Sequence, residues 1–216
     1  MKFYRYSQRR HTDSLLASGQ IRIGTLHDFR SSEHKRGVTD PMEGRKQISH
    51  FVRRGTSGGV SMDDKAVDFF GMVEIVNSTG CSVVNSTFTQ DHETRDCFIL
   101  CGSLEHSRSV AEQFDDTDSC VEIIDIAGFA ETLSRSLAKD FPIESFRVCP
   151  ITYADKNQSW NGIDLGLNPA ILKEPAFSGQ KEFRIIWELS NHVSITPVIL
   201  NELEIVKYIV NVGVPA

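Results

Sequence analysis

The sequence has no long apolar run and no recognisable export signal. None of its hydrophobic stretches approaches the length of a membrane span, so we expect no membrane partner. The opening residues, MKFYRYSQRRHTD, lack the apolar core that a signal peptide needs. Both absences favour a cytoplasmic protein.

Cysteine is scarce, with five residues in the chain. An odd number in a chain of 216 residues does not favour a disulfide framework. Cys97 and Cys101 lie four positions apart, but no nearby pair of His or Cys residues completes a zinc pattern. We therefore expect free thiols in a reducing compartment, and no metal site.

Positive charge is in deficit, because 23 Lys and Arg residues face 29 Asp and Glu residues, a net charge of −6. A protein that coats a nucleic-acid duplex is usually basic, so broad phosphate binding is not favoured. The first quarter of the chain nevertheless gathers basic residues: Lys2, Arg5, Arg9, Arg10, Arg22, Arg30, Lys35, Arg36, Arg45, Lys46, Arg53 and Arg54. This N-terminal basic cluster indicates either a solvated positive face or a site for the phosphates of a nucleotide or nucleic acid.

Linkers, repeats and low-complexity segments are also absent, so residues 1–216 are predicted to form a single domain. Strand patterns outnumber helix patterns and do not alternate with them, which indicates an α+β fold with a mostly antiparallel sheet. Strands are expected at residues 2–7, 21–30, 67–76, 81–90, 96–103, 119–126, 146–154, 181–189 and 202–212. Helices are expected at 11–20, 107–114 and 127–141, the first capped by Thr12 or Asp13 and ended by Gly19. Residues 31–65 are expected to be loops, and residues 77–80 a hairpin turn.

The stretch FSGQKEFRIIW, residues 177–187, places polar side chains at the start of an apolar strand. Gln180 and Glu182 lie two positions apart and therefore share one face of that strand. Taken alone, Glu182 fits an exposed strand residue paired with Lys181 or Arg184. Two polar groups side by side also fit the floor of a binding site. Other motifs of the chain favour this second interpretation.

Three short features resemble the mono-ADP-ribosyltransferases, in the order in which that family carries them. Arg5 lies in the first strand, Ser103 ends the turn Cys101-Gly102-Ser103 after a middle strand, and a Gln-x-Glu motif at Gln180 and Glu182 opens a late strand. The opening KFYRYS and the late KEFRII are also similar to a group of uncharacterised bacterial proteins that begin Tyr-Arg-Ser and carry a late Glu-x-Arg strand. The resemblance implies an ADP-ribosyltransferase-like fold, a split and mostly antiparallel sheet with flanking helices.

The resemblance also implies NAD as a substrate, with catalytic roles for two residues. Cleavage of the nicotinamide–ribose bond builds positive charge on the ribose, which a carboxylate stabilises. Glu182 is expected to do this and to hold the ribose 2′-hydroxyl. Gln180 is expected to orient the acceptor.

The remaining implied contacts would bind NAD or the acceptor. Arg5 is expected to grip the pyrophosphate through charge-assisted hydrogen bonds, although Arg9 or Arg10 fits that position too. Ser103 is expected to order the site, His27 to hold NAD, and Phe177 to touch the substrate.

The acceptor remains open from the sequence. Gln180 at the first position of the motif argues against arginine as acceptor, and in the family this motif accompanies modification of other side chains or of nucleic-acid bases. The cysteine and glycine of the Cys101-Gly102-Ser103 turn replace two hydroxyls of the family's turn, so the role of Ser103 departs from the pattern. The resemblance further suggests a bacterial toxin or a phage-defence effector, with an antitoxin protein as a partner.

Two other functions fit the residues. The first is a non-enzymatic module that binds a nucleotide or nucleic acid through the N-terminal basic cluster. The second is a metal-dependent nuclease that uses Asp40, Glu43 and nearby carboxylates, because paired carboxylates bind metals or transfer protons. With no third ligand nearby in the sequence, a simple turn at Asp40 and Glu43 is the better interpretation.

Overall fold

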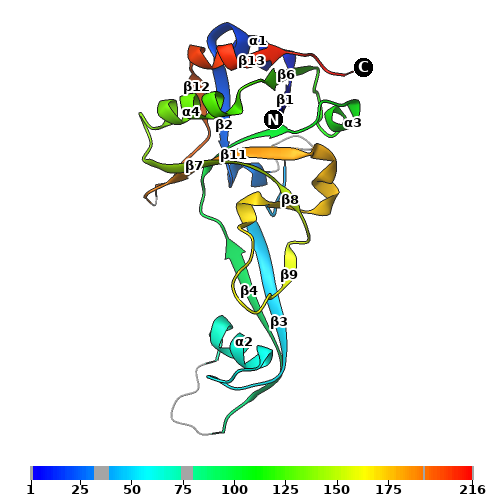
Figure 1. The fold of residues 1–216 in the computed structure, drawn as a ribbon, viewed down its shortest axis with the longest axis vertical. Helices are drawn as coiled ribbons and strands as arrows, with labels where there is room; N and C mark the ends of the chain where they lie inside the picture. The colour runs from blue at the N-terminus through cyan, green and yellow to red at the C-terminus, as the bar shows by residue number, and fades with distance from the viewer. Residues whose placement is uncertain (1, 32–38, 74–79, 192, 216) are drawn as a thin grey trace. The chain divides into compact units, whose positions relative to one another are not determined.

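The computed structural model describes residues 2–31, 39–73, 80–191 and 193–215 (Figure 1). The chain divides into two compact units. Unit 1 comprises Met1–Glu43, Arg95–Ala154 and Lys173–Ala216, and unit 2 comprises Gly44–Thr94 and Asp155–Leu172. The single domain over residues 1–216 stays a prediction, and each unit is described here by itself.

Unit 1 is built on a sheet whose strands all pair antiparallel, which confirms the predicted α+β class. Its strands are β1 (Phe3–Ser7), β2 (Gln20–Thr25), β5 (Phe98–Ser103), β6 (Ser119–Ile123), β7 (Ile143–Pro150), β11 (Glu182–Leu189), β12 (Val198–Asn201) and β13 (Ile209–Asn211). Strands β8 (Thr152–Tyr153) and β10 (Leu172–Lys173) form a separate short pair.

The sheet of unit 1 forks at β5. One edge of β5 pairs with β11 from end to end, from Glu182 opposite Ser103 to Trp187 opposite Phe98. Along the other edge, β2 lies beside Phe98 and Ile99, whereas β1 lies beside Ser103. From there β1 continues to β6 and β13, and β2 continues to β12. The polar C-terminal half of β5 therefore faces a fork between two diverging branches.

Alternation along β11 separates the core from the fork. Phe183, Ile185 and Trp187 belong to the main apolar cluster of unit 1, together with residues of helix α4 (Ile126–Leu137). The indole Nε1 of Trp187 donates a hydrogen bond of 2.7 Å to the hydroxyl of Ser134 in that helix. Because successive side chains of a strand point to opposite faces, Glu182 and Arg184 are turned away from this cluster.

Helix α1 (Arg9–Ser18) ends where the sequence predicts, at Gly19, which has φ 67° and donates its N–H to the carbonyl of Leu15. The predicted caps Thr12 and Asp13 are wrong, because the N-cap is Gln8. Thr12 is instead buried inside the helix, where its hydroxyl bonds that of Ser7 at 2.9 Å. The other helical segments of unit 1 are α3 (Arg108–Ala111), η1 (Asp28–Arg30), η3 (Pro175–Gln180) and η4 (Leu203–Tyr208).

Unit 2 corrects the predicted loop at residues 31–65, because strand β3 (Arg45–Gly55) and the start of helix α2 (Met62–Phe70) lie within it. Strand β3 pairs antiparallel with β4 (Val83–Glu93) and parallel with β9 (Asn157–Ser159). The strand expected at 67–76 is wrong for residues 67–70, which belong to helix α2. This helix begins with a capping box between Ser61 and Asp64. Residues 77–79 of the predicted turn lie outside the described residues. A short η2 (Pro169–Ile171) completes the unit.

The predicted C-terminal strand at 202–212 is shorter than expected. Its first part is the 3₁₀ segment η4, and only Ile209–Asn211 form β13. Strand β12 was not predicted. In the parts of the chain that the structure describes, no helix has the length and hydropathy to cross a bilayer.

Candidate active site in the fork of the sheet

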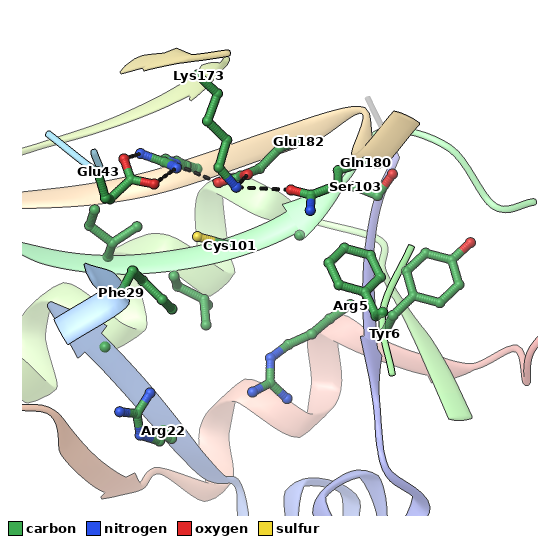
Figure 2. Close-up of a pocket in the computed structure, with 16 residues that line it drawn as sticks. Arg5, Tyr6, Arg22, Phe29, Glu43, Cys101, Ser103, Lys173, Gln180 and Glu182 are labelled. Carbon is green, nitrogen blue, oxygen red and sulfur yellow. Dashed lines mark hydrogen bonds and ion pairs between the residues drawn. The ribbon is translucent and has the colours of Figure 1, made fainter. Parts of the chain in front are cut away.

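A pocket of about 190 Å³ lies in unit 1, at the fork (Figure 2). The residues that line it come from strands β1, β2, β5, β10 and β11, from η1 and η3, and from the segments before β3 and after α3: Arg5, Tyr6, Arg22, Gly24, Phe29, Glu43, Ile99, Leu100, Cys101, Gly102, Ser103, Phe114, Lys173, Gln180, Glu182 and Arg184. All of them belong to unit 1.

Four of the predicted site residues line this one pocket: Arg5, Ser103, Gln180 and Glu182. The strand register explains their meeting, because Ser103 is opposite Glu182 on one side and opposite Tyr4, the neighbour of Arg5, on the other. Strands distant in sequence therefore bring the resemblance motifs together.

The other predicted contacts lie outside the lining of the pocket. His27 precedes η1, and its backbone N–H donates to Asp96 at 2.9 Å. Phe177 lies in η3, with the Lys173 ammonium 4.9 Å from the centre of its ring. Arg9 and Arg10, the alternatives to Arg5, lie at the start of α1 and do not line the pocket.

The carboxylate of Glu182 is buried between two cations. Only 5% of its side chain is exposed, so the predicted exposure of Glu182 is wrong, whereas the predicted pairing with Arg184 is confirmed. Its Oε2 is 2.5 Å from Nζ of Lys173, and its Oε1 is 2.5 Å from Nε of Arg184. Burial opposes the charged form, but Arg184 first and then Lys173 outweigh burial and lower the pKa of Glu182 to about 2. Glu182 is therefore ionised at neutral pH.

Arg184 also binds a second carboxylate. Its Nη1 and Nη2 donate to the two oxygens of Glu43 at 2.8 and 2.9 Å, and both side chains are 1% exposed. Burial opposes its charge, yet Glu182 and Glu43 raise the pKa of Arg184 well above the ordinary value. The predicted turn at Asp40 is present, because the N–H of Glu43 donates to the Asp40 carbonyl at 2.9 Å. The Glu43 carboxylate is nevertheless part of the site rather than of the surface.

Lys173 links Glu182 to Gln180. Its ammonium donates to Oε1 of Gln180 at 2.9 Å, and Gln180 is buried. Burial opposes the charged lysine, but the carboxylates of Glu182 and, more weakly, Glu43 raise its pKa. We call Glu43, Arg184, Glu182 and Lys173 the charge chain. It alternates in sign and sums to zero.

Arg5 and Arg22 supply positive charge to another part of the pocket. Figure 2 shows both side chains apart from Glu43 and Glu182. Arg22 pairs with Asp28 at 2.6 Å. Within the described ranges, the half-buried guanidinium of Arg5 has neither a hydrogen bond nor an ion pair. Burial lowers the pKa of Arg5, and the like charge of Arg22 adds to the effect. This side of the pocket is suited to an anion.

An aromatic wall accompanies these arginines. Tyr6 and Phe114 line the pocket with their rings stacked, 6.2 Å between centroids and 23° between planes. The hydroxyl of Tyr6 is anchored by the backbone N–H of Ser107 at 2.9 Å. Flat apolar surface of this kind suits a planar heterocycle.

Two further groups at the pocket are restricted by their surroundings. The hydroxyl of Ser103 accepts the N–H of Glu105 at 3.1 Å and donates to the carbonyl of Lys181 at 3.5 Å, so it closes a turn instead of bonding Glu182. Burial, with the nearby charge of Glu182, raises the pKa of the Cys101 thiol far above its ordinary value. Cys101 therefore lacks the thiolate that a nucleophilic cysteine requires.

Sequence reasoning missed several features of the pocket: the partnership of Glu43 with Arg184, and the lining residues Lys173, Tyr6 and Phe114. Arg22 was expected only within the N-terminal basic cluster, and Arg184 only as an ion-pair partner of Glu182. The predicted strand face shared by Gln180 and Glu182 is wrong, because Gln180 ends η3, Lys181 is left-handed with φ 48° and β11 begins at Glu182. Arg184 carried a usable signal, because it lies two positions after Glu182 on the same face of β11. Glu43 and Lys173 carried none, since tertiary contacts alone bring them to Arg184 and Glu182.

Comparison of the chain with protein-family models, with curated proteins and with solved structures finds no match. The resemblance to ADP-ribosyltransferases therefore rests on the short sequence motifs of this chain alone.

Proposed function

We propose that the protein is an NAD-dependent mono-ADP-ribosyltransferase with the fold of that family. The observation that carries the proposal is the convergence of Arg5, Gln180 and Glu182, from separate segments of the chain, on one pocket at the fork of the sheet. An unpaired guanidinium and a buried ionised carboxylate in one pocket match the two opposite needs of NAD, whose phosphates are anionic and whose ribose becomes cationic during cleavage.

In the proposed reaction the bond between the nicotinamide nitrogen and ribose C1′ breaks, and nicotinamide leaves with the electron pair. A nucleophile of the acceptor then bonds C1′ and releases its proton to solvent. Glu182 faces the developing cation as a carboxylate, and each of its oxygens can accept a bond beyond those from Lys173 and Arg184. Gln180, held by Lys173, lies beside it to orient the acceptor.

The size of the pocket suggests which part of NAD is enclosed. Its volume of about 190 Å³ is below the roughly 300 Å³ at which sites for drug-sized ligands begin. We therefore expect the reacting nicotinamide ribose to be enclosed, with the pyrophosphate at Arg5 and the rest of the dinucleotide outside. The aromatic wall of Tyr6 and Phe114 offers a surface for a planar ring.

The test is transfer of label from NAD, labelled in its ADP-ribose part, to components of a cell lysate. Glu182→Gln is expected to lower transfer by at least about 100-fold. Glu188→Gln, the same substitution at a half-exposed position of β11, is the matched control and is expected to keep it. Protease, DNase and RNase applied separately then assign the acceptor to protein, DNA or RNA. If the wild type shows no label transfer and releases no nicotinamide, the proposal is refuted.

A second candidate is a non-enzymatic nucleotide or nucleic-acid binding module. It is favoured by one observation, that Glu182 already has a cation on each oxygen while Arg5 has no partner among the described residues. This candidate predicts binding of ADP-ribose that Arg5→Ala weakens about 10- to 100-fold and Glu182→Gln leaves intact, without turnover of NAD. The nuclease alternative loses support, because Arg184 holds both oxygens of Glu43. A toxin or defence role and an antitoxin partner remain predictions from the resemblance.

A further inference from the structure

Glu43 is fixed in place by its own backbone. It lies before strand β3, outside the sheet, in a turn where its N–H donates to the carbonyl of Asp40 at 2.9 Å. Its own carbonyl accepts a hydrogen bond of 2.7 Å from Nε of Arg30. A carboxylate on a backbone held at both ends is a firm anchor for a longer side chain.

Arg184 is the longer side chain that this anchor holds. Its guanidinium has five donors in one plane, and a bidentate carboxylate fixes that plane. With Nη1 and Nη2 on Glu43, the remaining Nε edge is turned toward Glu182. Without Glu43, the guanidinium of Arg184 would lose the bidentate contact that fixes its plane in the lining of the pocket.

Glu43 also balances the charge chain. Lys173 is faced by Glu182 and Arg184 from β11, by Cys101 from β5, by Tyr153 from β8 and by Glu43. Removing the charge of Glu43 leaves two buried cations for one carboxylate, and burial then favours loss of a proton from Lys173. Both oxygens of Glu182 therefore depend on Glu43, one through the orientation of Arg184 and one through the charge of Lys173.

We propose that Glu43 is a positioning residue of this site, which holds Arg184 and, through it, the carboxylate of Glu182 in the working orientation. The proposal that Glu43 serves catalysis rests on the proposed function, whereas its effect on Arg184 and Lys173 does not. Glu43 touches no reacting atom in this scheme, and it acts through Arg184.

The kinetic test is Glu43→Gln, which keeps the shape and removes the charge. We expect kcat for NAD to fall about 100-fold, as for a misplaced catalytic group. KM should change less than about twofold, because Arg5 and the aromatic wall remain. The alkaline limb of the pH–rate profile should move to lower pH, because Lys173 loses its proton more readily. Glu188→Gln is the matched control and should change none of these.

Glu43→Asp separates position from charge, and it also serves if Glu43→Gln does not fold. The shorter carboxylate keeps the charge but cannot reach both Nη atoms from the same backbone. We expect a smaller fall in kcat, about 10-fold, with the alkaline limb unmoved. Wild-type kcat in both variants, or an equal loss in Glu188→Gln, would overturn the proposal.

A readout without turnover distinguishes this inference from the proposed function. In protein labelled with ¹⁵N-lysine, the signal of Lys173 is assigned by its absence from Lys173→Met, and its titration is followed. A lower pKa in Glu43→Gln with no NAD turnover by the wild type would keep the inference about the chain and refute the transferase. If the wild type turns over NAD, and Glu43→Gln leaves both the Lys173 titration and kcat unchanged, the transferase is supported and the inference about Glu43 is refuted.

Discussion

Glu43 and Arg184 stand 141 positions apart in the sequence and share two parallel hydrogen bonds, of 2.8 and 2.9 Å, in the interior of unit 1. Each side chain is 1% exposed, so both charges are shielded from bulk solvent. The pair continues through Glu182 to Lys173, which makes four buried charges that sum to zero. Removing one member should therefore cost far more than removing a neutral pair.

The first prediction concerns stability. Arg184→Met leaves Glu43 unpaired in the interior and should lower the unfolding free energy by about 3–5 kcal/mol. The double variant Arg184→Met with Glu43→Leu keeps the balanced pair of Glu182 and Lys173, and should recover most of that loss. Denaturant unfolding of the wild type, both single variants and the double variant measures the coupling. Additive losses would show that the two side chains act independently.

The second prediction concerns pH. The pKa of Glu182 is about 2 in the folded protein, below its ordinary value of 4.5, so its ionised form stabilises the fold above pH 4.5. That contribution is lost as the pH falls from about 4.5 through about 2. The difference in unfolding free energy between wild type and Glu182→Gln should therefore shrink between pH 6 and pH 3. A difference that stays constant over this range would contradict the assignment.

The third prediction separates Ser103 from Glu182. Because the Ser103 hydroxyl is bonded to the backbone of Glu105 and Lys181, Ser103→Ala should cost about 1 kcal/mol of stability. NAD turnover should fall by less than about tenfold, since no bond to Glu182 is lost. A 100-fold fall in kcat at unchanged stability would mean that the hydroxyl bonds the substrate instead.

The fourth prediction tests the end of helix α1. Gly19 has φ 67°, and a Cβ atom there would lie 2.1 Å from the carbonyl oxygen of Glu202. Gly19→Ala should therefore cost more than the roughly 1–2 kcal/mol of the left-handed conformation alone. Gly71 ends α2 with φ 57° and has open space around it, so Gly71→Ala should cost only that amount. Equal melting temperatures for the two variants would count against the close contact with Glu202.

Local patterns predicted the elements whose side chains follow the usual division of apolar and polar residues. Strands β1, β5 and β11 and helix α4 were found in this way. Strand β3 was missed, because its inward positions include Lys46, whose ammonium donates to the carbonyl of Leu165 inside unit 2. A lysine in the interior breaks the alternation that marks a strand.

The candidate site was predicted in part for a similar reason. Arg5, Ser103, Gln180 and Glu182 follow a known order of motifs, so a resemblance was enough to select them. From the sequence, Glu43 is visible only as half of an acidic pair with Asp40. Its real partner is Arg184, and sequence spacing holds no information about a contact made across 141 positions.

The fork of the sheet has a consequence for recognition by the main chain. No described strand pairs with β5 opposite Cys101 on the side away from β11. The Cys97 carbonyl points to that side, where it accepts the N–H of Leu26. The peptide groups of a strand alternate direction from residue to residue, so the amide and carbonyl of Cys101, four positions on, point to the same side. A ligand bound to this amide and carbonyl would be recognised by main-chain hydrogen bonds. Replacing Cys101 with alanine or serine would preserve those bonds. Selectivity of this kind depends on the geometry of the strand and not on which side chain occupies the position.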